Sequence, residues 1–589
     1  MKVKRTAILL CLTYLLLAGC GGGGGGGATA VNELVFAADW SNSTTGTVTG
    51  KSLLLRLFDS GSRTVRSLIV VKNVPGVQEI TFAGIDAGEY RLVAQLFASE
   101  QQIDLTGTAD IPITVSGSTR VEVGVGDTPV SLNVSPASAA FKVQSTQQFN
   151  ATLKSALNRV TFAEPNSIVW SQLVNVCSID PSTGLAMGSA AGSGSVRASS
   201  AKTGLSGAST VNVTPFVTAR SKWTVLVYMN AANDLAQFSG LNVNQMEQVA
   251  QNPDVRFVVQ WKQALFFDPK FPFEGTRRYL VRPDLTDGIA SELIQNMGSN
   301  IDMGSPTTLQ EFIQWGRTFF PADRYVLVIW NHGNGWKRGP GESYPTRGVS
   351  YDDQFGTSIN TWQLAQALGP DKWDIVAWDA SLMQMFEVAD EIKDRTGLVV
   401  GSEESPPGEG YPYERIFGLF RDTPDAPTKE LAKAFVNGML AVPEYASRKI
   451  TQSVLETSKF DGLTTALDQL GSALLANKDT IAPTIGQVRA AAQTYSQNST
   501  RYYRDLYDLC DKLKAAYSIS QITNAANLVQ TAINNLIVFE GHNANSSRSH
   551  GVSIDFSPGS VFAGLSADYA NLRVAQATHW DEWLAVAAN

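Results

Sequence analysis

Two residues suited to nucleophilic chemistry follow two strongly apolar segments of this 589-residue chain. His332 comes just after residues 325–330, and Ser381 just after residues 374–378. Apolar runs of this kind predict strands buried on both faces of a parallel sheet, and ligands bind at the carboxyl ends of such strands. A histidine and a hydroxyl facing one cleft would supply a general base and a nucleophile. The alternative is a serine that caps a helix and a histidine with a structural hydrogen bond, and spacing alone favours it.

The elements that must position these two residues form an α/β pattern from about residue 220 onward. Alternating strands and helices predict a three-layer α/β domain over residues 220–589. The stretch 428–537 is expected to be mostly helical and to pack around the sheet. The predicted strands cover residues 223–229, 255–261, 325–330, 374–378 and 398–402. The predicted helices lie near 239–251, from Thr307 onward, from an Asn360 cap to Leu368, and over about a dozen residues after Ser381.

Two all-β modules are predicted before this domain. Residues 31–127 alternate apolar and polar positions between turn signals, which indicates a small β-sandwich. Residues 128–215 resemble the bacterial Ig-like domains of surface proteins, through segments such as 130–136, 168–171 and 180–185. Trp170 and Cys177 are interpreted as core residues of this second module, rather than as a ligand contact and a reactive thiol. Both modules are expected to be spacers.

The N-terminus has the pattern of a lipoprotein signal. Positive residues precede an apolar run over residues 7–17, which is too short to span a membrane but suits residues 1–19 as a signal peptide. The run ends Leu-Ala-Gly-Cys, which predicts that Cys20 is lipidated; an ordinary signal peptide is the alternative. Residues 20–30 are then the lipid anchor and a glycine-rich tether. We expect a bacterial cell-envelope protein, in the outer membrane if the source has two membranes, because Gly21 replaces the usual retention aspartate.

Composition excludes several other classes of protein. Apolar residues make up 43% of the chain, enough to bury real cores. The net charge of −8 and the scattered basic residues argue against nucleic acid as a partner. Four cysteines exclude a disulfide-stapled scaffold, and four histidines argue against a histidine-rich metal site.

Seven segments of the α/β region carry a resemblance to a known family: 223–229, 331–336, 348–353, 378–383, 401–404, 410–413 and 550–556. Together they resemble the clostripain family of cysteine endopeptidases, which have a caspase-like fold. The resemblance runs from about 220 to 560 with its motifs in the family's order.

The resemblance implies a role for each of four residues. His332 matches the catalytic histidine, and Ser381 stands at the nucleophile position, where the family has cysteine. The backbone N–H groups of Gly333 and Ser381 would form the oxyanion hole. Asp379 matches the carboxylate that receives a basic P1 side chain, because a desolvated cation needs a partner. Peptides or proteins containing Arg or Lys are therefore the expected partners, besides the membrane.

Serine at position 381 changes the expected chemistry. A thiol is readily ionised next to a histidine, whereas a serine hydroxyl needs a general base that is itself held by a carboxylate. The family uses a dyad, and no carboxylate is assigned to His332. We therefore expect Ser381 to be a poor nucleophile. Cys510 is predicted to be a core residue on one face of a helix, so it does not take the place of the missing cysteine nucleophile.

Three smaller features bear on the site. Asp352 and Asp353 are candidate calcium ligands, since some family members depend on calcium. Two adjacent acids make a weak calcium site. No other cofactor is expected. Glu403 and Glu404 are expected to order the loop after a strand rather than to shape the cleft. His542 and His550 are expected to be structural.

Three functions remain open. The chain is a pseudopeptidase or very weak peptidase that binds Arg- or Lys-containing peptides, or an active Arg/Lys-specific endopeptidase that uses Ser381 and His332, or a surface adhesion or scaffold lipoprotein. The first is favoured by the chemistry at residue 381. Family members mature by cutting themselves after a basic residue between the histidine and the nucleophile. In that interval Lys337, Arg338 and Arg347 are expected to lie in a Gly/Pro-rich loop that suits such cleavage. We expect this protein to run as one intact chain.

Overall fold

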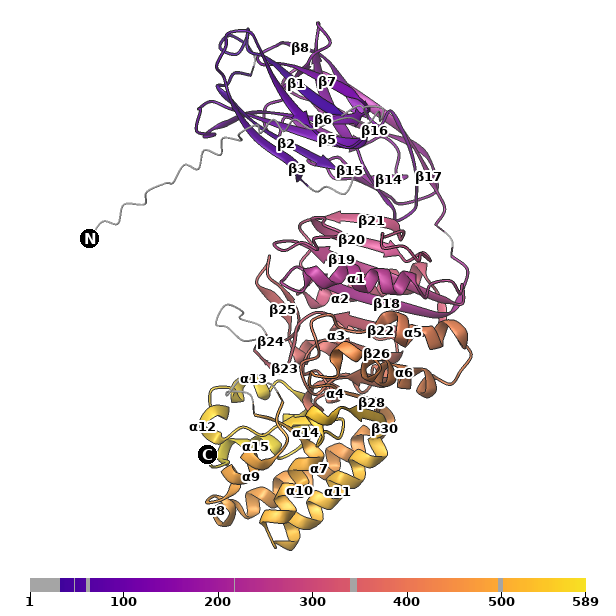
Figure 1. The fold of residues 1–589 in the computed structure, drawn as a ribbon, viewed down its shortest axis with the longest axis vertical. Coiled ribbons are helices and arrows are strands. Elements are labelled where there is room, and N and C mark those ends of the chain that lie inside the picture. Colours follow the sequence, from indigo (N-terminus) through magenta and orange to yellow (C-terminus); the bar gives the residue numbers. More distant parts are fainter. Residues whose placement is uncertain (1–31, 47, 60–63, 217, 339–346, 496–501) are drawn as a thin grey trace, which may run out of the picture.

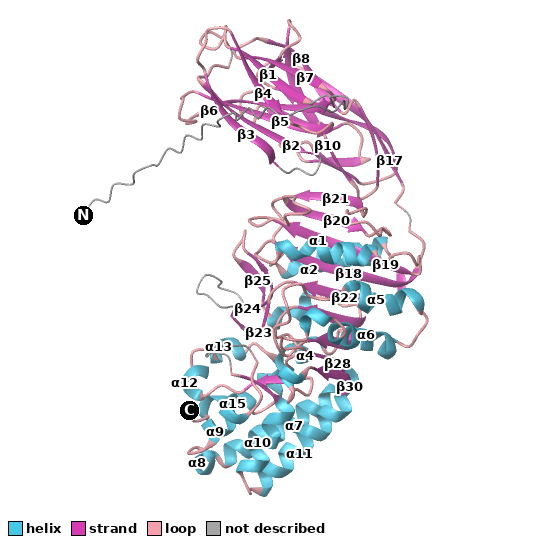
Figure 2. Ribbon diagram, in the orientation of Figure 1, coloured by secondary structure: helices cyan, strands magenta, loops and turns pink. Residues whose placement is uncertain are grey.

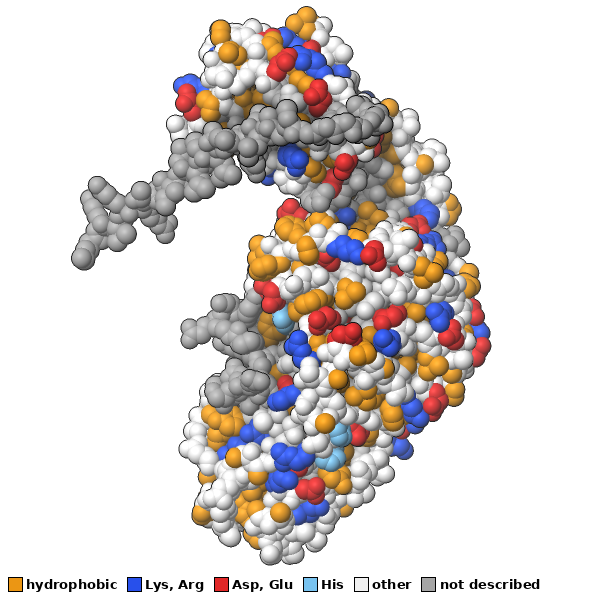
Figure 3. All heavy atoms as spheres, in the orientation of Figure 1, with side chains coloured by type: hydrophobic (Ala, Val, Ile, Leu, Met, Phe, Trp, Pro, Cys, Tyr) orange, Lys and Arg blue, Asp and Glu red, His pale blue; other side chains and the backbone are white. Residues whose placement is uncertain are grey.

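The computed structural model describes residues 32–589 except 47, 60–63, 217, 339–346 and 496–501. All-β modules at the N-terminal end stand beyond one edge of a larger α/β domain, and helices gather at the C-terminal end (Figure 1, Figure 2). Lys, Arg, Asp and Glu side chains are interspersed over the face drawn in Figure 3, without a single-sign patch over the described residues of that face. The predicted signal peptide, Cys20 and the tether lie outside the described residues.

The β-rich half contains two separate apolar cores. One lies between the sheets β4-β1-β7-β12-β11-β8 and β3-β2-β5-β6, and includes Phe36 and Leu55. The other includes Trp170 and Cys177, both buried, which agrees with the interpretation of these two as core residues. The six-stranded sheet continues across residue 128, because β7 pairs in parallel with β12. The Ig-like character of residues 128–215 stays a prediction.

The strands of this half are as follows: β1 (Glu33–Asp39), β2 (Ser52–Asp59), β3 (Thr64–Val71), β4 (Val77–Ala83), β5 (Gly88–Phe97), β6 (Leu105–Val115), β7 (Ser118–Gly124), β8 (Pro129–Ser135), β9 (Ser138–Lys142), β10 (Thr146–Gln148), β11 (Asn150–Ser155), β12 (Val160–Thr161), β13 (Ile168–Gln172), β14 (Cys177–Ile179), β15 (Leu185–Gly188), β16 (Gly192–Ser200) and β17 (Ser206–Thr214).

The α/β domain is built on a nine-stranded sheet in the order β21-β20-β19-β18-β22-β26-β27-β28-β30. The five strands from β19 to β27 are parallel, and the two at each edge are antiparallel. Nearly every residue of the central strands is buried, as the continuous apolar runs predict. The strands are β18 (Ser221–Ala231), β19 (Val255–Gln263), β20 (Gly275–Leu280), β21 (Glu292–Gly298), β22 (Ala322–Trp330), β26 (Trp373–Asp379), β27 (Thr396–Gly401), β28 (Thr451–Glu456) and β30 (Ile537–His542).

Helices cover both faces of this sheet and make three layers. The core on one face includes residues of α1 (Ala236–Glu247), α5 (Tyr413–Asp422) and α6 (Thr428–Leu440). The other face packs against further helices, so the α/β three-layer architecture is confirmed. These are α2 (Pro306–Phe319), α3 (Leu364–Ala367), α4 (Phe386–Ile392), α7 (Phe460–Ala476), α10 (Leu506–Ala516) and α11 (Ser520–Leu536).

Smaller elements complete the domain. Strands β23 (Gly333–Arg338), β24 (Arg347–Asp352) and β25 (Thr357–Ile359) form a three-stranded sheet beside the carboxyl ends of the central strands, and β29 (Tyr503–Asp505) pairs with β31 (Ser553–Asp555). The short helices are α8 (Lys478–Ile481), α9 (Ile485–Ala491), α12 (Gly559–Phe562), α13 (Ser566–Tyr569), α14 (Arg573–Ala577) and α15 (Trp580–Val586), and the 3₁₀ turns are η1 (Thr361–Gln363), η2 (Pro443–Tyr445), η3 (Thr457–Lys459) and η4 (Ala544–Ser546).

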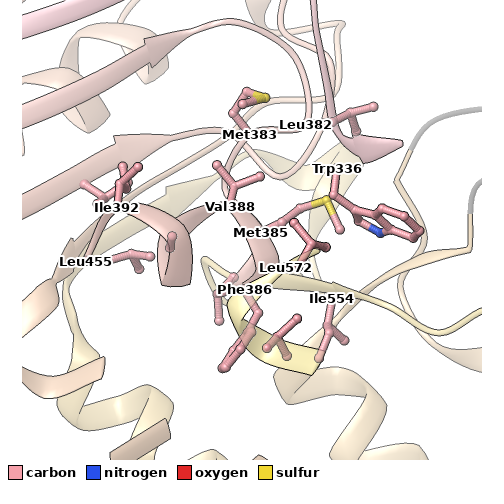
Figure 4. Close-up of a cluster of buried hydrophobic side chains, with 14 of the residues drawn as sticks. Trp336, Leu382, Met383, Met385, Phe386, Val388, Ile392, Leu455, Ile554 and Leu572 are labelled. Atoms are coloured by element: carbon pink, nitrogen blue, oxygen red, sulfur yellow. The ribbon is translucent and has the colours of Figure 1, made fainter. Parts of the chain in front are cut away.

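The segment after Ser381 differs from the prediction of a dozen helical residues. Helix α4 begins only at Phe386 and has seven residues. Leu382 has a φ of +63°, and Met385 pairs with Ser553 of β31, so the chain is not helical between them. Figure 4 shows Leu382, Met383 and Met385 of this segment with other buried apolar side chains of the core. The residues just after Ser381 are therefore packed into the core in a non-helical conformation, where helical turns were predicted. The mostly helical prediction for 428–537 also missed β28, which is a strand of the main sheet.

Candidate active site

The register of the central sheet brings His332 and Ser381 together. Strands β22 and β26 are parallel neighbours, and Trp330 is paired with Asp379. Each of the two predicted residues therefore lies two positions beyond the same registered pair, at the carboxyl edge of the sheet. Both line one pocket with a volume of about 160 Å³, on the scale of a single long side chain.

The carboxylate of Asp379 lies in this pocket and is 5% exposed. Its Oδ1 accepts a hydrogen bond of 3.0 Å from the backbone N–H of Tyr411, and its Oδ2 accepts one of 3.0 Å from the Tyr413 hydroxyl. Burial raises the pKa of Asp379 to about 7, although both hydrogen bonds favour the ionised form. A cation entering the pocket would restore the ionised form of Asp379. A basic side chain is a group that would supply such a cation.

The wall opposite Asp379 is a backbone segment that requires glycine. Gly410 has a φ of +70°, and a Cβ there would lie 2.8 Å from Asp379 Oδ1. Asn242 of α1 holds this segment, because its amide donates to the carbonyls of Glu409 (3.0 Å) and Tyr411 (3.3 Å). The same side chain accepts from the Trp330 indole at 2.7 Å, so the wall and strand β22 are fastened to one helix. The full lining is Leu235, Trp330, Asn331, His332, Asp379, Ala380, Ser381, Pro406, Pro407, Gly408 and Gly410.

The turn that carries Ser381 is held by its backbone. Its successor Leu382 is in the left-handed region and donates to the Glu404 carbonyl at 3.4 Å. Gly333 lies against this turn, since a Cβ at position 333 would be 2.4 Å from the Ser381 carbonyl oxygen. Gly333 is thus beside residue 381, where the resemblance expects it. The Ser381 hydroxyl forms no hydrogen bond with any residue that the structure describes.

A carboxylate contacts His332, which the sequence analysis did not find. His332 Nε2 lies 2.6 Å from Asp234 Oδ1. An ionised carboxylate can only accept a hydrogen bond, so Nε2 donates, and this bond holds the pKa of Asp234 below its usual value. Asp234 follows β18, which pairs in parallel with β22. Its position at the same edge of the sheet as His332 was the sequence feature from which this contact could have been predicted.

The remaining candidate residues are placed as follows. Cys510 is fully buried in α10, and burial raises the pKa of its thiol, so it is a core residue as predicted. Glu403 accepts from the Gly551 backbone at 3.0 Å, and the Glu404 carbonyl holds Leu382, so both order the loop. His550 and His542 contact Asp505 and Glu540, respectively, at 3.1 Å.

Two predicted features differ in their surroundings. Lys337 does not lie in an exposed loop, because it belongs to β23, is buried, and pairs with Asp555 at 2.9 Å. Asp352 is fully buried and pairs with Lys262 at 2.6 Å. Within the described part of the chain, no group of three or more His, Cys, Asp or Glu side chains is arranged to hold a metal ion. A role for calcium stays a prediction.

The parallel strands of the central sheet thus bring a histidine, a hydroxyl and a buried carboxylate into one pocket. The model of the clostripain family matches residues 227–585, more than half of the chain. The protein therefore belongs to the clostripain family of peptidases. Clostripain of Hathewaya histolytica is 23% identical over 380 residues, which cover 54% of this chain and 70% of that protein.

Solved structures of family members resemble this chain in part. An inactive zymogen C11 protease from Parabacteroides distasonis has 18% identity and a TM-score of 0.48, over 62% of this chain and 99% of that one. A secreted C11 cysteine protease from Bacteroides thetaiotaomicron, solved with an irreversible peptide inhibitor, has 18% identity and a TM-score of 0.45, over 60% of this chain and 99% of that one.

Proposed function

We propose that this protein is a lipid-anchored member of its family that captures the Arg or Lys side chain of a peptide in the Asp379 pocket and hydrolyses the peptide poorly. The observation that carries the proposal is the buried Asp379 carboxylate lining a pocket of about 160 Å³. A guanidinium or ammonium group is the partner that a desolvated carboxylate needs. The clostripain family model supports a peptide as the ligand.

Serine at position 381 supports binding rather than efficient turnover. A serine hydroxyl is un-ionised at neutral pH and reacts only as a base removes its proton. In the structure this hydroxyl has no hydrogen bond to His332. We therefore expect slow hydrolysis at most, and a chain that stays intact after purification.

Peptide binding tests the proposal directly. A fluorescent peptide with one central Arg is titrated with the full chain in detergent, and fluorescence anisotropy is recorded. The control peptide carries citrulline, which keeps the shape of Arg but has no charge. We expect the Arg peptide to bind and the citrulline peptide to bind at least about 10-fold more weakly, since a charge-assisted hydrogen bond contributes about 1.5–3 kcal/mol. Equal affinity for both peptides would refute the proposed pocket and favour a scaffold role.

The lipid anchor is the second part of the proposal. The Leu-Ala-Gly-Cys pattern before the glycine tether supports it. The described residues contain no helix long and apolar enough to cross a membrane. A Cys20→Ser variant should move from the membrane pellet to the supernatant after cell fractionation. A variant that still pellets with membranes would refute lipidation at Cys20.

A further inference from the structure

The carboxylate of Asp234 contacts Nε2, one of the two ring nitrogens of His332, and not Nδ1. The Nε2–Oδ1 distance of 2.6 Å is that of a charge-assisted hydrogen bond. Because a neutral imidazole carries one proton, an Nε2–H that donates to Asp234 leaves Nδ1 as the basic nitrogen. The contact therefore selects the tautomer of the ring.

The loop that carries Asp234 is fixed although its carboxylate is 71% exposed. Three buried asparagine amides donate to one carbonyl, that of Tyr351: Asn230 at 3.2 Å, Asn233 at 2.9 Å and Asn331 at 3.1 Å. Asn331 directly precedes His332, and Asn233 directly precedes Asp234. One set of hydrogen bonds thus positions both partners of the pair.

Neighbouring contacts complete this frame. Asn233 Oδ1 accepts from the Leu235 backbone at 3.1 Å, which closes a turn around Asp234. Asn331 Oδ1 accepts from the Tyr351 N–H at 2.8 Å. The loop before α1, the end of β22 and strand β24 are therefore joined at one point, immediately behind the His332–Asp234 pair.

We propose that Asp234 is a positioning residue that makes His332 a general base for Ser381, so that the site is a Ser381–His332–Asp234 triad. The Ser381 oxygen bonds to the peptide carbonyl carbon while its proton passes to His332 Nδ1. That proton then passes to the leaving amine as the C–N bond breaks, and water attacks the acyl-serine by the same route in reverse. Asp234 stabilises the imidazolium in both steps and is not itself protonated.

A thiol site has much less need of this carboxylate. A cysteine thiolate and an imidazolium already form an ion pair before the substrate binds. Serine lacks that option and relies on the orientation and basicity of the ring. The Asp234 contact is therefore the element of the structure that suits the residue found at position 381.

The inference rests on the proposed function, because turnover requires the basic side chain to be bound at Asp379. The two are separated by measuring peptide affinity by anisotropy and hydrolysis of a fluorogenic P1-Arg substrate on the same full-chain preparations in detergent. The variants are Asp234→Asn, Asp234→Glu, Ser381→Ala, Ser381→Cys and the double variant Ser381→Cys/Asp234→Asn. Asp287→Asn is the matched control, since the Asp287 side chain is 96% exposed and its carboxylate lies 3.4 Å from the Lys270 ammonium.

The expected result has three parts. Wild type hydrolyses the substrate faster than Ser381→Ala, and Asp234→Asn lowers kcat about 10-fold, equivalent to about 1.4 kcal/mol. Asp234→Glu recovers part of this loss, while peptide affinity stays within about twofold throughout. In the Ser381→Cys background the same Asp234→Asn change lowers kcat less than about threefold, because the thiolate needs no base.

Three results would overturn the inference. Wild type that hydrolyses no faster than Ser381→Ala would show that His332 and Asp234 do not activate the serine. A kcat unchanged in Asp234→Asn would remove Asp234 from the mechanism. An equal loss of kcat and peptide affinity would make Asp234 a binding residue. Loss of Arg-peptide binding in wild type would instead refute the pocket, and with it the proposed function.

Discussion

The pH dependence of peptide binding follows from the pKa of one buried carboxyl group. Burial raises the pKa of Asp379 from 3.8 to about 7 in the free protein. A neutral Asp379 forms no ion pair with a guanidinium, which itself stays protonated at every accessible pH. We therefore predict that the affinity for an Arg peptide rises with pH up to about 7 and then levels off.

The magnitude can be worked from that pKa. With a pKa of about 7, the carboxyl group is about 1% ionised at pH 5 and about 90% ionised at pH 8. The affinity should therefore increase about 90-fold between these pH values, with about ninefold of this between pH 5 and 6 and about fivefold between pH 6 and 7. Binding should release close to one proton at pH 5 to 6, because the bound cation lowers the pKa of Asp379.

Anisotropy titrations at half-unit steps from pH 5 to 8 measure the first quantity, and calorimetry in two buffers of different ionisation enthalpy measures the second. The Asp379→Asn variant is the control, because asparagine keeps the shape and cannot titrate. Any pH dependence that survives in Asp379→Asn has a source other than Asp379. A wild-type affinity that is flat between pH 5 and 8, or that falls with rising pH, would refute the reasoning.

Three further substitutions have defined outcomes. In Gly410→Ala the new Cβ, 2.8 Å from Asp379 Oδ1, should abolish Arg-peptide binding by anisotropy; undiminished affinity would contradict the assigned pocket wall. Lys262→Met leaves Asp352 buried without its partner and should lower the free energy of unfolding in urea by about 3–5 kcal/mol, with partial recovery in Lys262→Met/Asp352→Asn; a loss below about 1 kcal/mol would contradict the buried ion pair. Cys510→Ser buries a hydroxyl and should cost about 1–3 kcal/mol in the same assay while peptide binding is unchanged; a folded variant without binding would show that Cys510 belongs to the site.

The carboxyl edge of the sheet could be predicted from the sequence because the central strands have a clear apolar pattern. Residues 325–330 and 375–378 are continuous apolar runs, and the structure buries every residue of both in β22 and β26. Parallel pairing then fixes where their carboxyl ends lie, which brought His332, Ser381 and Asp379 into one pocket. Periodicity and topology suffice for such residues.

Contacts between residues far apart in the sequence had a weaker signal. Asp234 follows a strand that ends at the same sheet edge as His332, but it lies in a loop and is mostly exposed, so the sequence does not distinguish it from other loop aspartates. Its contact with His332 depends on the asparagine amides that converge on the Tyr351 carbonyl, 20 residues beyond Asn331. The late start of α4 was missed for a related reason: Leu382 adopts a positive φ because neighbouring backbone holds it there, which no helix propensity reveals. Lys337 was misplaced because its partner Asp555 is 218 residues away.

The energetics of Asp379 bear on whether the pocket still serves a ligand. A folded-state pKa of about 7 against 3.8 means that the folded chain binds more protons than the unfolded chain between about pH 4 and pH 7. Its free energy of unfolding therefore falls as pH rises through this window. Above pH 7 the ionised carboxylate destabilises the fold by about 4 kcal/mol, three units at 1.36 kcal/mol each.

An asparagine at position 379 would accept the same hydrogen bond from Tyr411 and carry no such cost. An Arg or Lys side chain in the pocket offsets this cost by pairing with the carboxylate. The ionised Asp379 therefore destabilises the free protein and not the complex. Asp379→Asn should accordingly raise the free energy of unfolding at pH 8 while it weakens Arg-peptide binding. Urea unfolding at pH 5 and pH 8 distinguishes the cases, because the stabilisation by asparagine should be about 2.7 kcal/mol smaller at pH 5 than at pH 8, which is about two pH units at 1.36 kcal/mol each. A variant that is less stable than wild type at pH 8 would mean that the carboxylate serves the fold, and the pocket would lose its strongest physical argument for a basic ligand.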